Sequence, residues 1–288
     1  MEIAKLIGLI VQVSMGLIIL SVALNATVKD LTYLLRKPGL LIRSLLAMYV
    51  IMPLFAIALA LLFNLNPIVE AALIALALSP VPPVLPRKEL KAGGAASYTL
   101  GLFAIAAIVS IFYVPLAAEM IGRAFGQDLE VSTSRIALIV ATSVLLALVL
   151  GVAIRAWLPS LADKLARPAA IIGTVLLFLA LIPILIKMWP EISALIGNYT
   201  VVAIIGFVVV GLLVGHLLGG PDPEERTVLA LSTATRHPAI AMAILYQAKQ
   251  HTTVLAAVLL VLLVGTIVSI PYVKWRKRTH GVDSPRPA

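Results

Sequence analysis

"SPVPPVLPRKEL", residues 79–90, interrupts a long apolar run with four prolines and then places two cations, Arg87 and Lys88, directly before Glu89. The prolines are Pro80, Pro82, Pro83 and Pro86. Proline lacks a backbone N–H and clashes with the preceding helical turn, so a regular helix cannot continue through this stretch. We therefore expect a broken helix here, shaped mainly by Pro82, Pro83 and Pro86, with cations close to the break.

The composition around this stretch is that of a membrane protein. Of the 288 residues, 61% are hydrophobic and only 12% are charged, whereas soluble domains average about 25% charged residues. Too little polar surface is present to cover a soluble globule of this size. We expect an all-α polytopic membrane protein.

The net charge of +9 is better explained by membrane orientation than by nucleic-acid binding. Lys and Arg collect in the cytoplasmic loops of membrane proteins, and no basic patch interleaved with aromatic residues is present. The absence of cysteine excludes disulfides and thiol chemistry. The apolar N-terminal stretch has no small-residue cleavage site, so we expect a retained transmembrane helix rather than a signal peptide.

Nine stretches are long enough to cross the hydrocarbon core, for which a helix needs about 20 apolar residues. They are roughly 5–26, 40–63, 67–93, 96–121, 134–157, 168–189, 199–219, 223–249 and 253–273. With the N-terminus outside, most loop cations fall on the inner side and the C-terminus is cytoplasmic. This predicts a multi-pass protein of a bacterial-type inner membrane.

A second polar interruption lies in the eighth stretch. "LSTATRHPAIAMAI", residues 231–244, carries Arg236 and His237 directly before Pro238, with apolar residues on both sides. Charged side chains at that depth cost several kcal/mol unless they are paired or wet. The freed backbone groups likewise need protein or water around them.

Two broken helices at matching positions in two halves of a chain are typical of inverted-repeat transporters, in which the helix ends build the substrate site. We expect a first repeat over residues 1–124 with its crossing helix near 67–93. A second repeat is expected over 125–274, with its crossing helix near 223–249, and a basic cytoplasmic tail over 275–288. One alternative stays open, in which Arg87 and Lys88 are ordinary cations at the cytoplasmic end of a short helix.

With both breaks, the chain resembles the bile acid:sodium symporter family over nearly its whole length. "LIILSVALNATVKDLTYLLRKPGLLIRSLLAMYVIMPLFAIAL" is similar to that family's helix, loop and helix ending in Met-Pro. "SPVPPVLPRKELKAGG" and "DPEERTVLALSTATRHPAIAMAI" occupy the places of the family's two crossing helices. The resemblance implies a core with two crossing helices that moves against a panel of other helices, and an organic-anion substrate.

The sodium-binding motifs of the family are not matched. In an ungapped alignment, the family's sodium-binding Glu falls on Leu231, its Gln on Thr235 and its crossover Asn on Arg236. The Ser-Asn pair of the first crossing falls on Arg87 and Lys88, in a register good to about one residue. We therefore expect fixed cations to take the place of sodium, complementing half-helix C-terminal carbonyls or holding an anion.

Several other polar residues are weaker candidates. His237 could carry a coupling proton, although a structural histidine at the break is the simpler interpretation. Thr233 and Thr235 could bind substrate or satisfy the break, and Glu89 could pair with Lys88 or Arg87. No catalytic motif, cofactor motif or metal-ligand spacing is visible, so we expect no enzyme activity, no cofactor and no bound metal.

The sequence predicts a sodium-independent secondary transporter of an organic carboxylate or sulfonate, bile-acid-like or smaller, working by alternating access. Arg236 and Lys88 are its expected charged groups, followed by Arg87. Its expected partners are the substrate and the lipid bilayer, with protons as a further candidate, but not nucleic acid. Its expected oligomeric state is a monomer or weak dimer. A sodium-coupled symporter, a cation/proton antiporter and a non-transporting membrane sensor or assembly subunit remain alternatives.

Overall fold

The computed structural model describes residues 2–124, 132–245 and 251–279, and these residues are almost entirely helical. The helices are α1 (Glu2–Ala23), α2 (Val28–Leu31), α3 (Pro38–Leu46), α4 (Met52–Leu62), α5 (Pro67–Leu78), α6 (Leu85–Lys91), α7 (Ala96–Ala124), α8 (Thr133–Val140), α9 (Leu146–Trp157), α10 (Pro159–Ala194), α11 (Thr200–Leu218), α12 (Pro223–Ala234), α13 (Pro238–Ile244) and α14 (His251–Thr279). Two π-helical segments, Ala47–Ile51 and Ala141–Leu145, join α3 to α4 and α8 to α9.

The prediction of an all-α polytopic membrane protein is confirmed. Within the described residues, six helices are long and apolar enough to cross a membrane. They are Leu6–Ala23, Pro38–Leu62, Ala96–Arg123, Pro159–Ala194, Thr200–Leu218 and Thr252–Thr279. The other three predicted stretches are the α8–α9 run and the two broken helices, so seven of the nine stretches are mainly helical where the structure describes them and two are interrupted.

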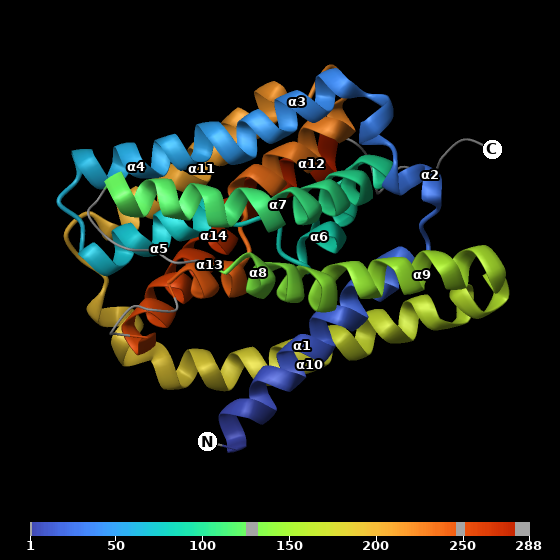
Figure 1. Cartoon of the computed structure of the whole chain (residues 1–288), viewed down its shortest axis with the longest axis horizontal. Coiled ribbons are helices and arrows are strands. Elements are labelled where there is room, and N and C mark those ends of the chain that lie inside the picture. Colours follow the sequence, from blue (N-terminus) through green and yellow to red (C-terminus); the bar gives the residue numbers. More distant parts are fainter. Residues whose placement is uncertain (1, 125–131, 246–250, 280–288) are drawn as a thin grey trace.

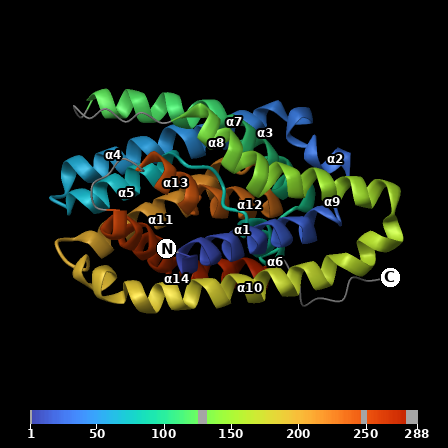
Figure 2. The same ribbon diagram turned by 60° about the horizontal axis from the view of Figure 1, so that its bottom comes forward.

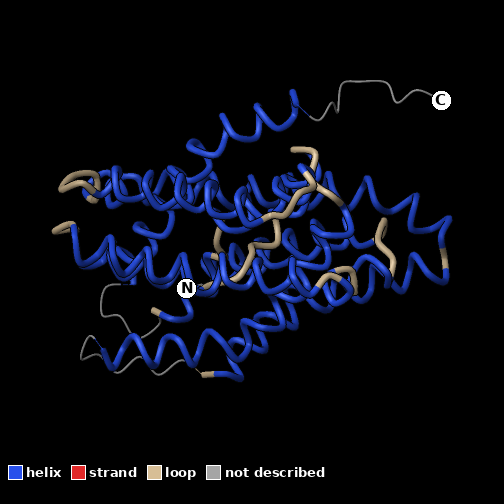
Figure 3. The backbone as a smooth tube through the Cα atoms, turned by 90° about the horizontal axis from the view of Figure 1, so that it is seen from above, coloured by secondary structure: helices blue, strands red, loops and turns tan. Residues whose placement is uncertain are grey.

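The two interrupted stretches are broken where the prolines predict. The first runs as α5, a non-helical segment over 79–84, and α6, with Pro86 in the first turn of α6. The second runs as α12, a short extended segment over 235–237, and α13, which begins at Pro238. Figure 3 shows both interruptions as loop segments within the helical bundle rather than at its ends.

Three helices, α1, α9 and α10, pack closely together, and we call them the panel (Figures 1 and 2). Small residues allow this contact, because Gly151 of α9 lies against Ala23 of α1, and Gly173 of α10 lies against Ser14 and Ile18 of α1. The outer face of α10 exposes large apolar side chains, as a lipid-facing helix should. They include Ile171, Val175, Phe178, Leu179, Ile182 and Ile186.

The second body, which we call the core, contains both broken helices together with α3, α4, α7, α11 and α14. A stripe of glycines on α11 and directly after it faces α12, and its members are Gly211, Gly215 and Gly219. Any Cβ at these positions would collide with the backbone of α12. Small residues of this spacing let two membrane helices approach closely. The stripe therefore fixes α12, and with it the second break, against α11.

The C-terminal helix α14 extends through Thr279, so the first residues of the predicted basic tail are helical. Arg276 in this stretch is buried, and it donates hydrogen bonds to Thr227 Oγ1 and to the carbonyl of Pro223. These contacts attach the end of α14 to the first turn of α12. The remainder of the predicted tail, residues 280–288, lies outside the described residues.

Candidate functional site at the helix crossing

The two breaks contact each other through the backbone. The N–H of His237, in the second break, donates to the carbonyl of Pro80, in the first, at 2.9 Å. The carbonyl of Pro80 lies in the non-helical segment over 79–84, where no regular helical hydrogen bond is made. One break therefore supplies a hydrogen bond that the other lacks, and the two broken helices cross at this point.

Arg236 lies at the same crossing and is 2% exposed. Its guanidinium donates to the carbonyl of Ser79 at 3.2 Å, through Nη1, and to the carbonyl of Met48 at 2.8 Å, through Nη2. Ser79 ends the half-helix α5, where the helix dipole is negative and favours a cation. The Arg236 side chain therefore stabilises backbone carbonyls of the core through hydrogen bonds.

Prolines free both carbonyls that Arg236 binds. For Ser79, the helical donors three and four residues on would be Pro82 and Pro83, and neither has an N–H. Met48 lies in the π-helical segment, where the donor would come from residue 53, which is also a proline. Tyr49, one residue later, loses its ordinary helical donor to the same proline and accepts from Tyr113 Oη at 2.5 Å. Each freed carbonyl has thus received a side-chain donor.

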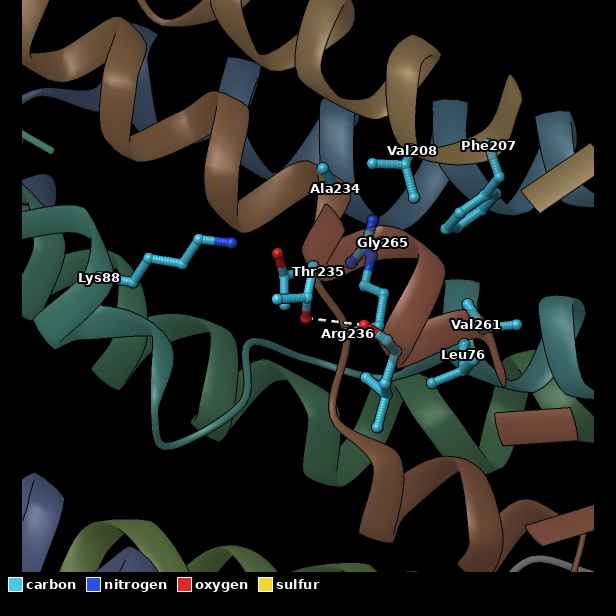
Figure 4. A pocket seen from close by; sticks show the side chains of 11 residues that line it. Leu76, Lys88, Phe207, Val208, Ala234, Thr235, Arg236, Val261 and Gly265 are labelled. Atoms are coloured by element: carbon cyan, nitrogen blue, oxygen red, sulfur yellow. Dashed lines mark hydrogen bonds between the residues drawn. The ribbon is translucent and has the colours of Figure 1, made fainter. Parts of the chain in front are cut away.

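Lys88 and Arg236 line one small cavity of about 30 Å³, between α6, the second break, α11 and α14. Figure 4 shows Lys88 reaching from α6 toward Thr235, with Arg236 beyond it. The Lys88 ammonium donates to Ser269 Oγ on α14 at 2.6 Å. The structure therefore brings together two of the predicted cations, and Thr235 with them.

Arg87 points elsewhere and is not among the residues that line this small cavity. It reaches α10 of the panel, where Nη1 donates to the carbonyl of Ala170 at 2.9 Å and to Thr174 Oγ1 at 2.6 Å. The break ends at residue 84, so Arg87 lies on α6 itself, on the face toward the panel. It bridges core and panel rather than the two breaks.

Two larger cavities lie between the panel and the core, on either side of Arg87. One, of about 260 Å³, is lined by four cations, Arg87, Lys88, Lys91 and Lys277, together with Thr174 and apolar side chains. The other, of about 340 Å³, is lined by Arg87, Lys91 and Arg167, with Ser21, Asn25 and apolar side chains. No Asp or Glu is among the lining residues of either cavity, so their positive potential attracts anions.

The remaining predicted site residues are buried at the second break. Thr233 is fully buried and His237 is 1% exposed. Neither Thr233 Oγ1 nor the ring nitrogens of His237 have a hydrogen-bond partner among the described residues. Leu231, where the family has its sodium-binding carboxylate, is fully buried as well. The aligned position thus offers no ligand for a metal ion.

The expected pairing of Glu89 with Lys88 or Arg87 is wrong. Neither pair is among the ion pairs of the described residues, and Glu89 instead accepts a hydrogen bond from Ser232 Oγ on α12 at 2.6 Å. Adjacent residues on a helix point about 100° apart. Lys88 and Glu89 consequently face α14 and α12, respectively.

Sequence reasoning missed several residues of the site. Met48 contributes only a carbonyl, and the signal that could have found it is Pro53, which removes a donor from the turn before it. Lys91, Arg167 and Lys277 are among the loop cations that, in the sequence, indicate only the orientation in the membrane. Their convergence on one pair of cavities follows from the packing of α6, α10 and α14, which the sequence does not display.

A helical membrane protein with two broken helices crossing in its core, and a panel beside it, has the architecture of a secondary transporter. The model of the sodium bile acid symporter family matches residues 12–189, more than half of the chain. The chain belongs to this family, and the resemblance found in the sequence is confirmed. Comparison with curated proteins gives no match.

Proposed function

We propose that this protein is a sodium-independent secondary transporter of organic anions, working by alternating access. Its family consists of transporters of the bile acid/sodium symporter type. Beyond membership of this family, we propose the class of substrate and the absence of sodium coupling. It retains the sequence-based expectation of a substrate that carries a carboxylate or sulfonate.

One observation carries the proposal: the Arg236 guanidinium donates to the carbonyl of Ser79, at the end of the half-helix α5, and to that of Met48, in the π-helical segment between α3 and α4. Carbonyl oxygens at a half-helix C-terminus are ligands that transporters use to coordinate sodium. A buried guanidinium on those oxygens excludes a metal cation by charge and by space. With Leu231 at the position that the alignment gives to the family's carboxylate, the crossing supports a fixed positive charge rather than a bound metal ion.

The cavities between panel and core support an anionic substrate. Arg87 and Lys91 line both cavities from α6, and Lys88 lines the one of about 260 Å³. The apolar side chains between the cations suit the hydrophobic part of an amphipathic ligand. Arg binds a carboxylate or sulfonate through two N–H groups, whereas Lys acts as a point charge. In the proposed orientation these cavities open toward the cytoplasm, since Lys91, Arg167 and Lys277 fall on the inner side.

Movement of the core against the panel would expose the crossing to each side in turn. The hydrogen bonds of Arg87 to Ala170 and Thr174 span the two bodies and have to break during this movement. Neutral acceptors suit such a contact, because breaking it costs less than breaking a buried ion pair. The inverted repeat that relates the two halves is part of the proposal.

Uptake into liposomes tests the proposed function. The purified protein is reconstituted, and uptake of labelled taurocholate, benzoate and succinate is measured with sodium or choline as the only external cation. At least one anion is expected to enter protein-containing vesicles faster than empty ones, at the same rate in both salts. Uptake that requires sodium would refute sodium independence and favour the symporter alternative.

The same assay separates transport from sensing. A membrane sensor or assembly subunit would bind an anion without carrying it across the bilayer. Saturable binding of a labelled anion to detergent-solubilised protein, with no uptake into vesicles that contain it, would contradict the transport function and support that alternative.

A further inference from the structure

Glu89 is a buried carboxyl group at the contact between the two broken helices. It lies on α6, is 1% exposed, and its Oε1 accepts a hydrogen bond from Ser232 of α12 at 2.6 Å. The turn after α6 holds it there, because the N–H of Gly94 donates to the Glu89 carbonyl at 2.9 Å. A Cβ at Gly94 would collide with Val228 of α12. The carboxyl is therefore fixed between the two broken helices of the core.

No cation pairs with this carboxyl among the residues that the structure describes. The charged and titratable groups on the elements around it are directed elsewhere. From α6, Lys88 points to Ser269 and Arg87 to the panel. From α7, the Tyr98 hydroxyl pairs with Ser44, and from α12, Glu225 is bound by Lys37 and Tyr33.

The other charged groups near α6 line the cavities on its panel side and are Lys91, Arg167 and Lys277. The groups that face the carboxyl are instead neutral hydroxyls. Ser232 donates to it, and Thr99 of α7 faces it without completing a hydrogen bond. Thr99 is 1% exposed, and a buried hydroxyl without a partner indicates space for an additional donor or acceptor.

A carboxylate without an ion pair is strongly disfavoured in such surroundings, because one hydroxyl donor does not replace its hydration. A protonated carboxyl removes most of that cost and also gains a donor, which Thr99 can accept. We infer that Glu89 is a proton-binding site: it holds a proton in this conformation and releases it when the crossing becomes hydrated. The step is the binding of one aqueous proton to a carboxylate oxygen, with no other bond made or broken.

This inference rests on the proposed function and names its coupling ion. A proton on Glu89 removes a negative charge beside the cations of the anion site, so it strengthens anion binding. By linkage, a bound anion strengthens proton binding by the same factor. Proton and anion would then move together, which selects proton symport among the driving forces that sodium independence leaves open.

Infrared spectroscopy of the purified protein in lipid vesicles at pH 7 tests the site without any substrate. The wild-type protein is expected to show the C=O stretch of a protonated carboxyl, shifted in deuterated water. Glu89→Gln is expected to lose this band, and Glu70→Gln, which removes a half-buried carboxyl on α5, is expected to keep it. Absence of the band from wild type, or its persistence in Glu89→Gln, would overturn the inference.

A second variant protects the test against misfolding of Glu89→Gln. Ser232→Ala removes the hydrogen bond to Oε1 and keeps the carboxyl, so the band is expected to remain and to change frequency. An unchanged frequency would show that the band arises elsewhere and would also overturn the inference. Because the measurement requires no transport, sodium-coupled uptake with the band present would refute the proposed function alone.

Discussion

At the scale of single residues, Arg236 stabilises the backbone of the core before it acts on any ligand. It satisfies carbonyls that Pro53, Pro82 and Pro83 leave without donors. The sequence placed Arg236 at the crossing, because its alignment with the family's asparagine needed no gap. It did not show which carbonyls the guanidinium binds, because those come from α5 and from the π-helical segment, far away in the chain.

Replacing Arg236 by Gln should lower the free energy of unfolding by about 2–5 kcal/mol, since two buried carbonyls lose a charged donor. Thermal unfolding in detergent measures this loss. Arg123→Gln is the matched control, because Arg123 is exposed and its ion pair within the described residues is with Glu119, one turn away. Equal stability of the two variants would contradict the structural role of Arg236.

Asp30, in the connector between α1 and α3, gives a pH-dependent prediction. Burial alone would raise the pKa of this carboxyl, but hydrogen bonds from Ser97 and Thr27 leave the pKa below its ordinary value. A lowered pKa in the folded state contributes stability above the unfolded value of about 3.9, and this contribution is lost as the pH falls through the folded value.

Asp30→Asn should therefore be less stable than wild type at pH 7, and the difference should shrink toward pH 3. Thermal unfolding as a function of pH measures it. Asp163→Asn, a control at an exposed carboxyl, should show little change. If the difference in stability between wild type and Asp30→Asn stays constant over this pH range, the hydrogen bonds do not depend on the charge of the Asp30 carboxylate.

At the scale of helices, the two breaks were predictable and their contacts were not. Proline chemistry is local, so Pro83 and Pro238 predict interruption from the sequence alone. The direction of Arg87 depends on where α6 begins, and a shift of one residue rotates a side chain by about 100°. The sequence therefore grouped Arg87 with the crossing, whereas the structure places it against the panel.

Packing of α11 on α12 should tolerate no side chain at Gly215. Gly215→Ala forces a Cβ into the backbone of Leu229 and Ala230, and overpacking of this kind costs about 1–3 kcal/mol. Gly206→Ala on the same helix meets no atom within 4 Å and should be neutral or slightly stabilising. Thermal unfolding of both variants measures the loss of stability. An equal loss of stability in both variants would exclude close packing as the cause.

At the scale of the whole molecule, alternating access requires the panel and the core to move apart. The sequence predicted nine helical stretches and the family, because hydrophobic length and proline position are local signals. It did not predict that cations from α6, α10 and α14 gather on one pair of cavities, because that depends on how the two bodies pack.

The absence of native cysteine allows a direct test of this movement. Cysteines at Val84 and Leu177, which line the same cavity from the first break and from α10, should stop anion uptake when joined by a short crosslinker. A reducible crosslinker should restore uptake after reduction. Cysteines at Arg155 and Asp163, which pair between α9 and α10 within the panel, should leave uptake intact when joined, and full uptake in the first pair would contradict relative movement.

The claim that a guanidinium replaces a metal ion predicts that sodium has no specific effect on the folded protein. An ion that binds the folded state alone raises the unfolding temperature, and the rise grows with the logarithm of the ion concentration above the dissociation constant. A variant with Arg236→Asn and Leu231→Glu restores the residue types that the family uses at these positions, and it should gain stability in sodium over choline.

The most direct measurement is the unfolding temperature of the wild-type protein in sodium chloride and in choline chloride, titrated at constant ionic strength. We predict the same temperature in both salts at every concentration. A rise with increasing concentration that occurs with sodium alone would show a sodium ion bound to the folded protein and would contradict the account.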